Sequence, residues 1–430
     1  MKPEQEEANN EDTDNPVIPP VAGDVIGDTA YSERFVLKIL LKLANLDSLK
    51  HEVKEKAFED DLCILWDMTA ERDVVLFLQK HDVLKLFNFA LPVIDSPRMI
   101  EIIVGIIGNM CCQKEAVTVL LKMDSLLALL LDYINTDDSL VLIQLLRLVS
   151  ACLFLADGDD ITTWMDLFLN MEYSSALYFI LNNSSNKDLL VTALENFNTV
   201  CSYCNTEKLQ DKFFTHFVTV EALESLTVAF TEVSVNQKDL CNKDELERIL
   251  VISLQITLNL VGFDKSPEIY NGSKQNVVTM IHVIMKYYEN KLCNHKEIDT
   301  DVVDVIESTN TVVSVLQISG ICEPIQYFEQ TCHMWKYISL VTKNDQNGSA
   351  FEEYDKNEVK EFSEKVKPVL CTLICIYISQ CSEENLLKTL DHIQEDYEDI
   401  INFVRDKELK AAVSSRADNY RTRLKENVDS

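Results

Sequence analysis

The chain has 430 residues, and 47% of them are hydrophobic, which is enough for a substantial core. Glycine and proline contribute only 9 residues each, about a third of their usual share, and this scarcity favours long helices with few turns. The formal net charge of −32 repels nucleic acid and anionic membranes, so we expect a basic protein or peptide as the partner.

The cysteines and the start of the chain bear on its location. Thirteen cysteines are an odd number, and several lie within apolar helical stretches, among them Cys152, Cys371 and Cys375. Such residues behave as small reduced hydrophobes. The first residues lack the basic start and apolar run of a secretory signal, and no apolar run approaches the roughly 18 residues of a membrane span. We therefore expect a location in the nucleus or cytoplasm and not outside the cell.

In chain order, the sequence predicts three parts. Residues 1–22 are acidic and rich in Asn and Pro, which predicts a disordered tail. Residues 23–404 read as one armadillo-like helical repeat domain, with polar insertions near 234–247 and 342–364. Residues 405–430 alternate basic and acidic residues and predict a closing helix and tail. At the start of the repeat domain, we expect Gly23–Ser32 to be ordered and to cover the first helices, since terminal repeats need a cap.

Residues 60–112 give the clearest helical pattern and predict three consecutive amphipathic helices. Ser96 and Pro97 open the last one, because serine is a good N-cap and proline fits the first helical position. Apolar residues then recur every three or four positions, which places a wide stripe on one side. Gly108 is expected to leave room for a neighbouring helix, and Asn109 falls where an armadillo unit points a polar side chain into its groove.

Further repeats can be aligned on the polar residue of each inner helix. Taking Asn109, Ser150, Asn198 and Asn259 as equivalent, the positions seven and five before and two after are all apolar. The intervals between these four residues are 41, 48 and 61 residues, against about 40–47 in armadillo and HEAT units. The predicted fold is therefore all-α, an armadillo/HEAT-like right-handed helical solenoid of about five to seven units.

Three asparagines are the candidate partner-binding residues: Asn109, Asn198 and Asn259. An asparagine amide offers both a donor and an acceptor, as pairing with the N–H and C=O of an extended peptide requires. The alternative is that these side chains cap or bridge neighbouring helices, and the sequence leaves both open. An architectural scaffold that uses its outer helix faces is the second functional hypothesis.

The sequence predicts no catalytic, cofactor or metal site. It has no GxGxxG, GxxxxGK[ST], GxSxG or HExxH, so the common phosphate-binding, nucleophile-elbow and zincin arrangements are absent. Cys201 and Cys204 have the spacing of half a zinc site, but no second pair follows at a suitable distance. An enzyme assembled from distant residues is the third and least favoured hypothesis.

Several motifs near the start of the chain resemble one family. They are, in order, Gly23–Ser32, Trp66–Met68, Asp73–Gln79, Pro97–Arg98 and Val104–Met110. In order and spacing these segments resemble the serum amyloid A-like (SAAL) proteins, over about a fifth of the chain. The resemblance implies an armadillo-like helical fold, a nuclear or nucleo-cytoplasmic location and an association with cell proliferation. It brings no known enzymatic activity and no assigned ligand residues.

Overall fold

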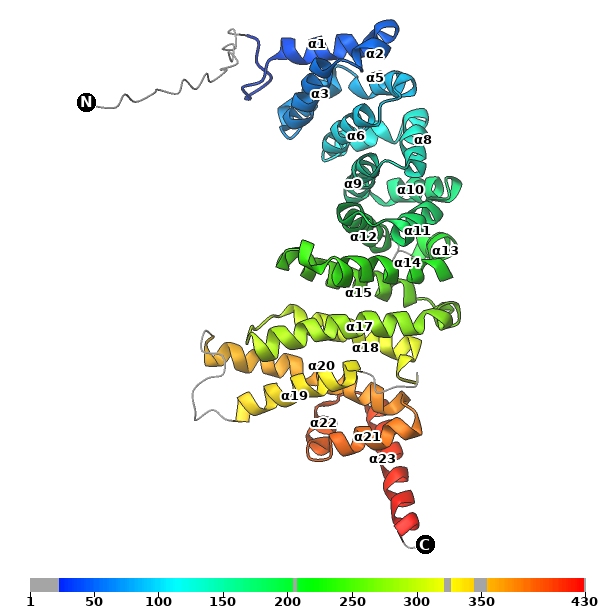
Figure 1. Ribbon diagram of the computed structural model, residues 1–430, viewed down its shortest axis with the longest axis vertical. Coiled ribbons are helices and arrows are strands. Elements are labelled where there is room, and N and C mark those ends of the chain that lie inside the picture. The colour runs from blue at the N-terminus through cyan, green and yellow to red at the C-terminus, as the bar shows by residue number, and fades with distance from the viewer. Residues whose placement is uncertain (1–22, 204–206, 321–325, 344–353, 429–430) are drawn as a thin grey trace, which may run out of the picture. The chain divides into compact units, whose positions relative to one another are not determined.

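The structure, a computed structural model, describes residues 23–203, 207–320, 326–343 and 354–428 (Figure 1). These residues form helices and contain no strand, which confirms the predicted all-α class. The predicted disorder of residues 1–22 lies outside the described part. Where the sequence predicted one continuous repeat domain, contacts divide the chain into two units, Met1–Leu129 and Leu130–Ser430.

The first unit consists of short helices with connecting turns. They are α1 (Glu33–Ala44), α2 (Leu46–Glu52), α3 (Lys56–Met68), α4 (Arg72–Lys80), α5 (Val83–Ala90), η1 (Leu91–Val93), α6 (Pro97–Met110), α7 (Lys114–Leu120) and α8 (Asp124–Asp132), inside which the unit ends. Helix α1 packs on α3 and α5, and α3 packs on α6. The sequence predicted three helices within residues 60–112, whereas the structure has four, α3, α4, α5 and α6, because the chain turns at residues 69–71 between α3 and α4.

Gly105 sets the close approach of α6 to α3. A Cβ added there would overlap the indole ring of Trp66, which lies on α3. Seven apolar side chains of α6 are buried at 0–1% exposure and contain the apolar stripe predicted from the sequence; they include Met99, Ile102, Ile106 and Met110. The sequence had assigned the space-making role to Gly108, three residues further along the helix.

The segment Gly23–Ser32 folds against the first helices. Ile26 is only 2% exposed, and the Asp28 N–H donates to Asp73 Oδ2 at 2.9 Å. Gly27 has a positive φ of 52°, and a Cβ at this position would overlap Asp73. The Ser32 side chain caps α1 by accepting from the Phe35 N–H. The segment is therefore ordered, as predicted, and its capping role stays a prediction.

The second unit contains longer helices. They are α9 (Ser139–Leu155), α10 (Gly158–Asn170), α11 (Tyr173–Asn183), α12 (Lys187–Ser202), α13 (Glu207–Phe217), α14 (Val220–Thr231), α15 (Lys243–Val261), α16 (Ser266–Ile269), α17 (Lys274–Glu289), α18 (Asp301–Leu316), α19 (Gln326–Lys343), α20 (Lys356–Gln380), α21 (Glu383–His392), α22 (Tyr397–Phe403) and α23 (Lys407–Val428). Short turns complete it: η2 (Tyr133–Asn135), η3 (Glu232–Asn236), η4 (Lys238–Leu240), η5 (Asn271–Ser273), η6 (Asn290–Asn294) and η7 (Ile318–Gly320).

Helices of the second unit pack in two series. In one, α9 packs on α12, α12 on α15, α15 on α18 and α18 on α20; in the other, α11 packs on α14, α14 on α17 and α17 on α19. Figure 1 shows α9 and α12 following one another, with α10 and α11 beside them. Each helix thus meets the helix that holds the same place in the preceding group, about 50 to 60 residues earlier in the chain.

Two helices begin inside the segments that the sequence predicts as polar insertions. α15 begins at Lys243, inside the segment 234–247, because the Asn242 side chain caps it by accepting from the Glu245 N–H. α20 begins at Lys356, inside the segment 342–364, because Asp355 and Glu358 form a capping box. Both starts consist of short polar side chains, and a polar composition by itself predicts a loop. Residues 344–353 lie outside the described part.

No single helix among the described residues is long and apolar enough to cross a membrane. The pair Leu209–Phe217 and Val220–Asn236 meets the length and composition criteria only when joined, and the two helices are bent by 67°.

Candidate functional site

Asn109 lies in the first unit, where its amide joins two helices. It is half-buried on α6, and its Nδ2 donates to the Trp66 carbonyl at 3.3 Å and to Thr69 Oγ1 at 3.0 Å. Both acceptors lie on or at the end of α3. These hydrogen bonds correspond to the helix-bridging alternative that the sequence left open.

In the second unit, Asn196 makes the matching contact. This residue is 0% exposed, and its Nδ2 donates to the Leu146 carbonyl and to Ser150 Oγ, each at 3.1 Å. Its Oδ1 accepts from the Tyr173 hydroxyl at 2.8 Å. Asn196 therefore ties α12 to α9 as Asn109 ties α6 to α3. Sequence reasoning missed it, although the signal was present: Asn109 and Asn196 follow the hydroxyl residues Thr69 and Ser150 by 40 and 46 residues.

Asn198 is half-buried on the same helix, and its side-chain oxygen, unlike that of Asn196, has no hydrogen-bond donor among the described residues. This Oδ1 atom is also buried. An acceptor in this position costs free energy unless it is satisfied, on the order of 1–3 kcal/mol. Asn198 is therefore less involved in the packing of the helices than Asn196.

Asn259 lies near the end of α15, beside a hollow. The hollow has a volume of about 250 Å³ and is lined by Asn259 together with Gln210 of α13, Phe263, and Thr311 and Val315 of α18. Asn259 is half-exposed there. Asn198 and Asn259 thus lie on helices that pack together, α12 and α15, whereas Asn109 belongs to the other unit.

The exposed sides of α9, α12, α15 and α18 together form what we call the row face. Its solvent-accessible residues recur every three or four positions along each helix. They are Gln144, Arg147, Ala151 and Phe154 on α9; Asp188, Glu195, Asn198 and Ser202 on α12; Asp244, Arg248, Val251, Gln255 and Asn259 on α15; and Asp301, Asp304, Glu307, Thr311 and Ser314 on α18.

Contacts across the helices connect these residues into one surface. Arg248 of α15 pairs with Glu195 of α12 at 2.9 Å. The hollow beside Asn259 connects α15 to Thr311 of α18. Beneath the surface, the buried Asn196 donates to Ser150 and so joins α12 to α9.

The row face is acidic. It carries six carboxylates (Asp188, Glu195, Asp244, Asp301, Asp304 and Glu307) and two guanidinium groups (Arg147 and Arg248), which leaves a net charge of −4. The acids of α18 are exposed at successive turns, and that helix contains no Lys or Arg. By contrast, Glu245 and Glu247 on the flank of α15 are neutralised by Lys187 at 2.9 Å and Lys291 at 2.6 Å. The uncompensated negative charge therefore lies on the open side of the helices.

Several ionisable groups with strongly shifted pKa values are core residues. Burial raises the pKa of the Cys332 and Cys371 thiols and of the Tyr173 hydroxyl far above their ordinary values, which disfavours the thiolate that nucleophilic chemistry needs. In the described part of the chain, no group of three His, Cys, Asp or Glu residues could hold a metal ion. Cys201 is buried, and Cys204 lies outside the described residues.

Comparison with known proteins gives several relatives over part of the chain. It is 32% identical to protein saal1 of Danio rerio over 177 residues, which are 39% of this chain and 37% of that protein. It is 30% identical to protein SAAL1 of Homo sapiens over 184 residues, or 39% of this chain and 38% of the relative. It is 31% identical to protein saal1 of Xenopus tropicalis over 180 residues, which are 39% of this chain and 38% of that protein. The matched part thus spans less than two-fifths of each relative.

No family model matches the chain. A crystal structure of an engineered protein aligns over 89% of this chain and 93% of that protein, at 12% sequence identity and a TM-score of 0.37.

Proposed function

We propose that this chain is a member of the SAAL family, since 39% of it is similar to the SAAL1 proteins, and that it is a non-enzymatic binding module. Its row face holds an extended, basic segment of a partner protein, as an adaptor or a chaperone-like protein would. The observation that carries the proposal is the acidic row face, on which Asn198 and Asn259 remain outside the contacts that join the helices.

We further propose that the fold is an armadillo-like, right-handed solenoid. The ordered packing of α9, α12, α15, α18 and α20 supports it, since stacked repeats contact only their neighbours. A second series of helices, from α11 to α19, runs beside the first. Stacked repeats offer a long continuous surface, which suits a partner in extended conformation.

The charge and the asparagines would make different contributions to binding. The carboxylates of α18 attract a basic segment from a distance and speed its association, an effect that salt screens because the Debye length falls from about 10 Å at 0.1 M to about 3 Å at 1 M. Hydrogen bonds from Asn198 and Asn259 to the peptide backbone are each worth about 0.5–1.5 kcal/mol net and depend less on salt.

The experiment measures the binding of a fluorescent Lys/Arg-rich peptide, and then of the partner recovered from cells, at several salt concentrations. Asp304→Asn with Glu307→Gln should weaken binding most at low salt and reduce the salt slope. Asn198→Ala with Asn259→Ala should weaken binding at every salt concentration and leave the slope unchanged. Asp47→Asn with Glu115→Gln makes the same charge change at exposed acids of the first unit and is the matched control.

Adding Asn109→Ala to the double asparagine variant also removes the hydrogen bonds from Asn109 to Trp66 and Thr69, so this third change affects the stability of the first unit as well as any binding. If the partner binds the double asparagine variant as tightly as the parent, or binds the parent more tightly as salt rises, the row face is not the binding surface.

A scaffold that uses its outer faces is the second candidate. The observation in its favour is Phe179 on α11, which is 68% exposed and lies on the other series of helices. A partner lost with Phe179→Ser and kept with the asparagine variants would support the scaffold. A location in the nucleus or cytoplasm and a link to cell proliferation are further proposals, tested by imaging the tagged chain in cells and by counting cells after its depletion.

A further inference from the structure

The hollow beside Asn259 has apolar walls, although the row face around it is acidic. It is lined by Leu258 of α15, by Phe263 just after that helix and by Val315 of α18, and all three side chains are half-exposed. Apolar surface that water reaches gains free energy when another apolar group covers it. The walls of the hollow therefore suit an apolar occupant.

Phe263 is held in place by two phenylalanines of α13. Its ring stacks on that of Phe213 with 5.9 Å between the centroids, and its centroid lies 5.4 Å from that of Phe214. Phe213 is itself fully buried. Because these ring contacts fix the wall, the hollow exists without an occupant, and binding does not have to order it first.

Polar side chains surround the opening of the hollow. Gln210 of α13 and Thr311 of α18 complete the lining with Asn259, and both are exposed. The Thr311 hydroxyl donates to the carbonyl of Glu307 at 3.2 Å. The amides of Gln210 and Asn259 each offer a donor and an acceptor. They can therefore bond the backbone of a segment whose side chain enters the hollow.

Carboxylates follow the hollow along α18 at the spacing of its turns. Glu307 precedes Thr311 by four residues and Asp304 precedes it by seven, and both acids are exposed. At 1.5 Å per residue they lie about 6 Å and about 10.5 Å along the helix from Thr311. Alternate residues of an extended chain face one side and are about 6.6 Å apart. With one side chain in the hollow, lysines or arginines two and four positions away thus reach Glu307 and Asp304.

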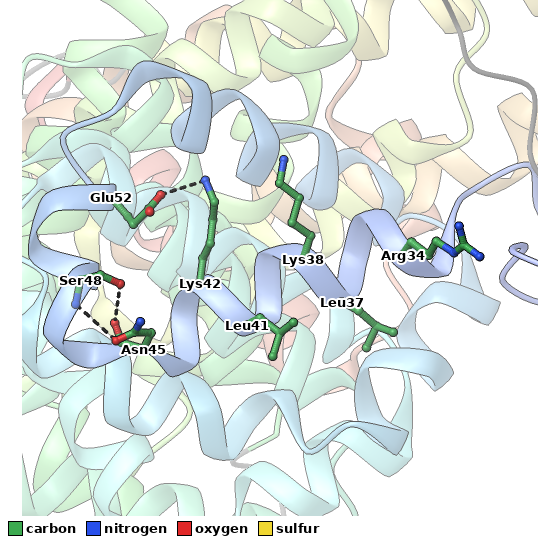
Figure 2. A pocket seen from close by; sticks show the side chains of 8 residues that line it. All are labelled: Arg34, Leu37, Lys38, Leu41, Lys42, Asn45, Ser48 and Glu52. Carbon is green, nitrogen blue, oxygen red and sulfur yellow. Dashed lines mark hydrogen bonds and ion pairs between the residues drawn. The ribbon is translucent and has the colours of Figure 1, made fainter.

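The groove along α1 in the first unit has the opposite charge (Figure 2). It has a volume of about 470 Å³, and Arg34, Lys38 and Lys42 line it together with Leu41. The side chains of Arg34 and Lys38 are 76% and 64% exposed. These cations repel a basic segment, so the exposed Leu41 does not compete for it. The hollow beside Asn259, by contrast, combines apolar walls with nearby acids.

We propose that this hollow fixes the register of the basic segment on the row face. It takes one apolar side chain of about the size of leucine, and Glu307 and Asp304 take basic side chains two and four positions away. The inference rests on the proposed function and names the residue pattern that the row face selects. A segment with basic residues alone lacks this anchor and binds more weakly.

The first test uses the full chain and two short fluorescent peptides. One has a central leucine, lysines at the second and fourth positions on either side and serines elsewhere, so it fits in either direction; the other has alanine in place of the leucine. Fluorescence anisotropy at low salt should show that the leucine peptide binds roughly tenfold more tightly, because three more carbon atoms leave water. Equal affinities would overturn the inference.

Filling the hollow gives the second arm. Thr311→Trp places a large ring in it and should abolish the preference for the leucine peptide. Thr279→Trp on α17 is the matched control and should keep the preference, because Thr279 is also exposed and its hydroxyl also donates to the carbonyl four residues earlier, at 3.1 Å. Thermal melting verifies that each variant folds. A preference that survives Thr311→Trp in a folded protein would mean that the leucine binds elsewhere, and the inference would be wrong.

The same measurements separate this inference from the proposed function. If the two peptides bind equally, and both are weakened by salt and by Asp304→Asn with Glu307→Gln, the row face binds basic segments but the hollow does not anchor them. If neither peptide binds, or if the two charge changes have no effect, the proposed function fails together with this inference.

Discussion

At the scale of single residues, Gly105 controls how closely α6 approaches α3. An alanine there would drive its Cβ into the Trp66 indole, so Gly105→Ala should destabilise the first unit by about 1–3 kcal/mol, the usual cost of overpacking. Urea unfolding of the full chain measures the change. Gly158→Ala is the control, because Gly158 has open space around its Cβ position. Equal midpoints for the two variants would contradict the packing argument.

The sequence predicts the close approach at Gly108, one helical turn from Gly105, where the structure has it. Two glycines, 105 and 108, lie on α6, and both agree with the apolar period, so nothing in the sequence tells which one faces an indole. The same limit applies to Asn196 and Asn198. Periodicity predicted the helix and its buried side, whereas the choice between two polar neighbours depends on the rotation of α12 against α9.

His216 is expected to make stability depend on pH. Burial lowers its pKa from 6.5 to about 4, and its Nε2 accepts from the Ser174 N–H at 3.3 Å. Between pH 6.5 and 4 the unfolded state takes up a proton that the folded state does not bind, so the free energy of unfolding falls as the pH falls. Urea midpoints at pH 7 and pH 5 should differ more for the parent than for His216→Gln. An equal pH dependence of both proteins would show that His216 does not contribute.

At the scale of elements, Gly23–Ser32 is expected to stabilise the first helices. Ile26 is buried, and Asp28 bonds Asp73. Deleting residues 1–22 should leave the melting temperature nearly unchanged, whereas deleting residues 1–32 should lower it, because apolar surface is then exposed and the Ser32 cap of α1 is lost. If both deletions melt at the same temperature, the segment does not cap the unit; a partner lost at unchanged stability would identify it as a binding motif instead.

The joint between α12 and α9 gives a second prediction for elements. Asn196→Ala removes two buried hydrogen bonds to α9 and leaves the Tyr173 hydroxyl without its acceptor, so unfolding should become easier by about 1–3 kcal/mol for each buried group left unsatisfied. Asn198→Ala, two residues along the same helix, should cost much less and is the control. Thermal and urea unfolding of both variants check this; a larger loss for Asn198→Ala would reverse the assignment.

The helical elements were largely predictable because their signals are local. The apolar period located α3, α6, α9, α12 and α15, and the Ser96-Pro97 start predicted the beginning of α6. The start of α20 was missed although Asp355 and Glu358 have the spacing of a capping box, since the surrounding residues are polar and outweighed it. For Asn109 the sequence left open both peptide binding and a bridge to a neighbouring helix, because an asparagine amide can make the hydrogen bonds of either role.

At the scale of the whole molecule, the net charge of −32 opposes the folded state through self-repulsion. Raising the salt from about 0.05 M to about 0.5 M shortens the Debye length severalfold, so the melting temperature should rise. The exposed ion pairs act in the opposite sense, but each is worth little. Calorimetry across the salt series is the measurement, and a melting temperature that falls with added NaCl would mean that the ion pairs outweigh the repulsion.

The division into two units could not be read from the sequence. It falls inside α8, between Leu129 and Leu130, in the middle of an uninterrupted apolar run. A boundary of this kind reflects how many contacts cross it, and no composition shift, proline or glycine marks it. Net charge and helix content, by contrast, are sums over the residues of the chain, so the sequence by itself predicts them.

The buried thiols offer a way to time local opening in each unit without any added label. Cys111 is 0% exposed in the first unit, as are Cys371 and Cys375 in the second. A small alkylating reagent can reach such a sulfur only when the surrounding helices separate, so the rate of modification reports how often that occurs. Mass spectrometry resolves the modified peptides individually. One reaction on the unmodified protein would therefore give the opening rates of both units separately.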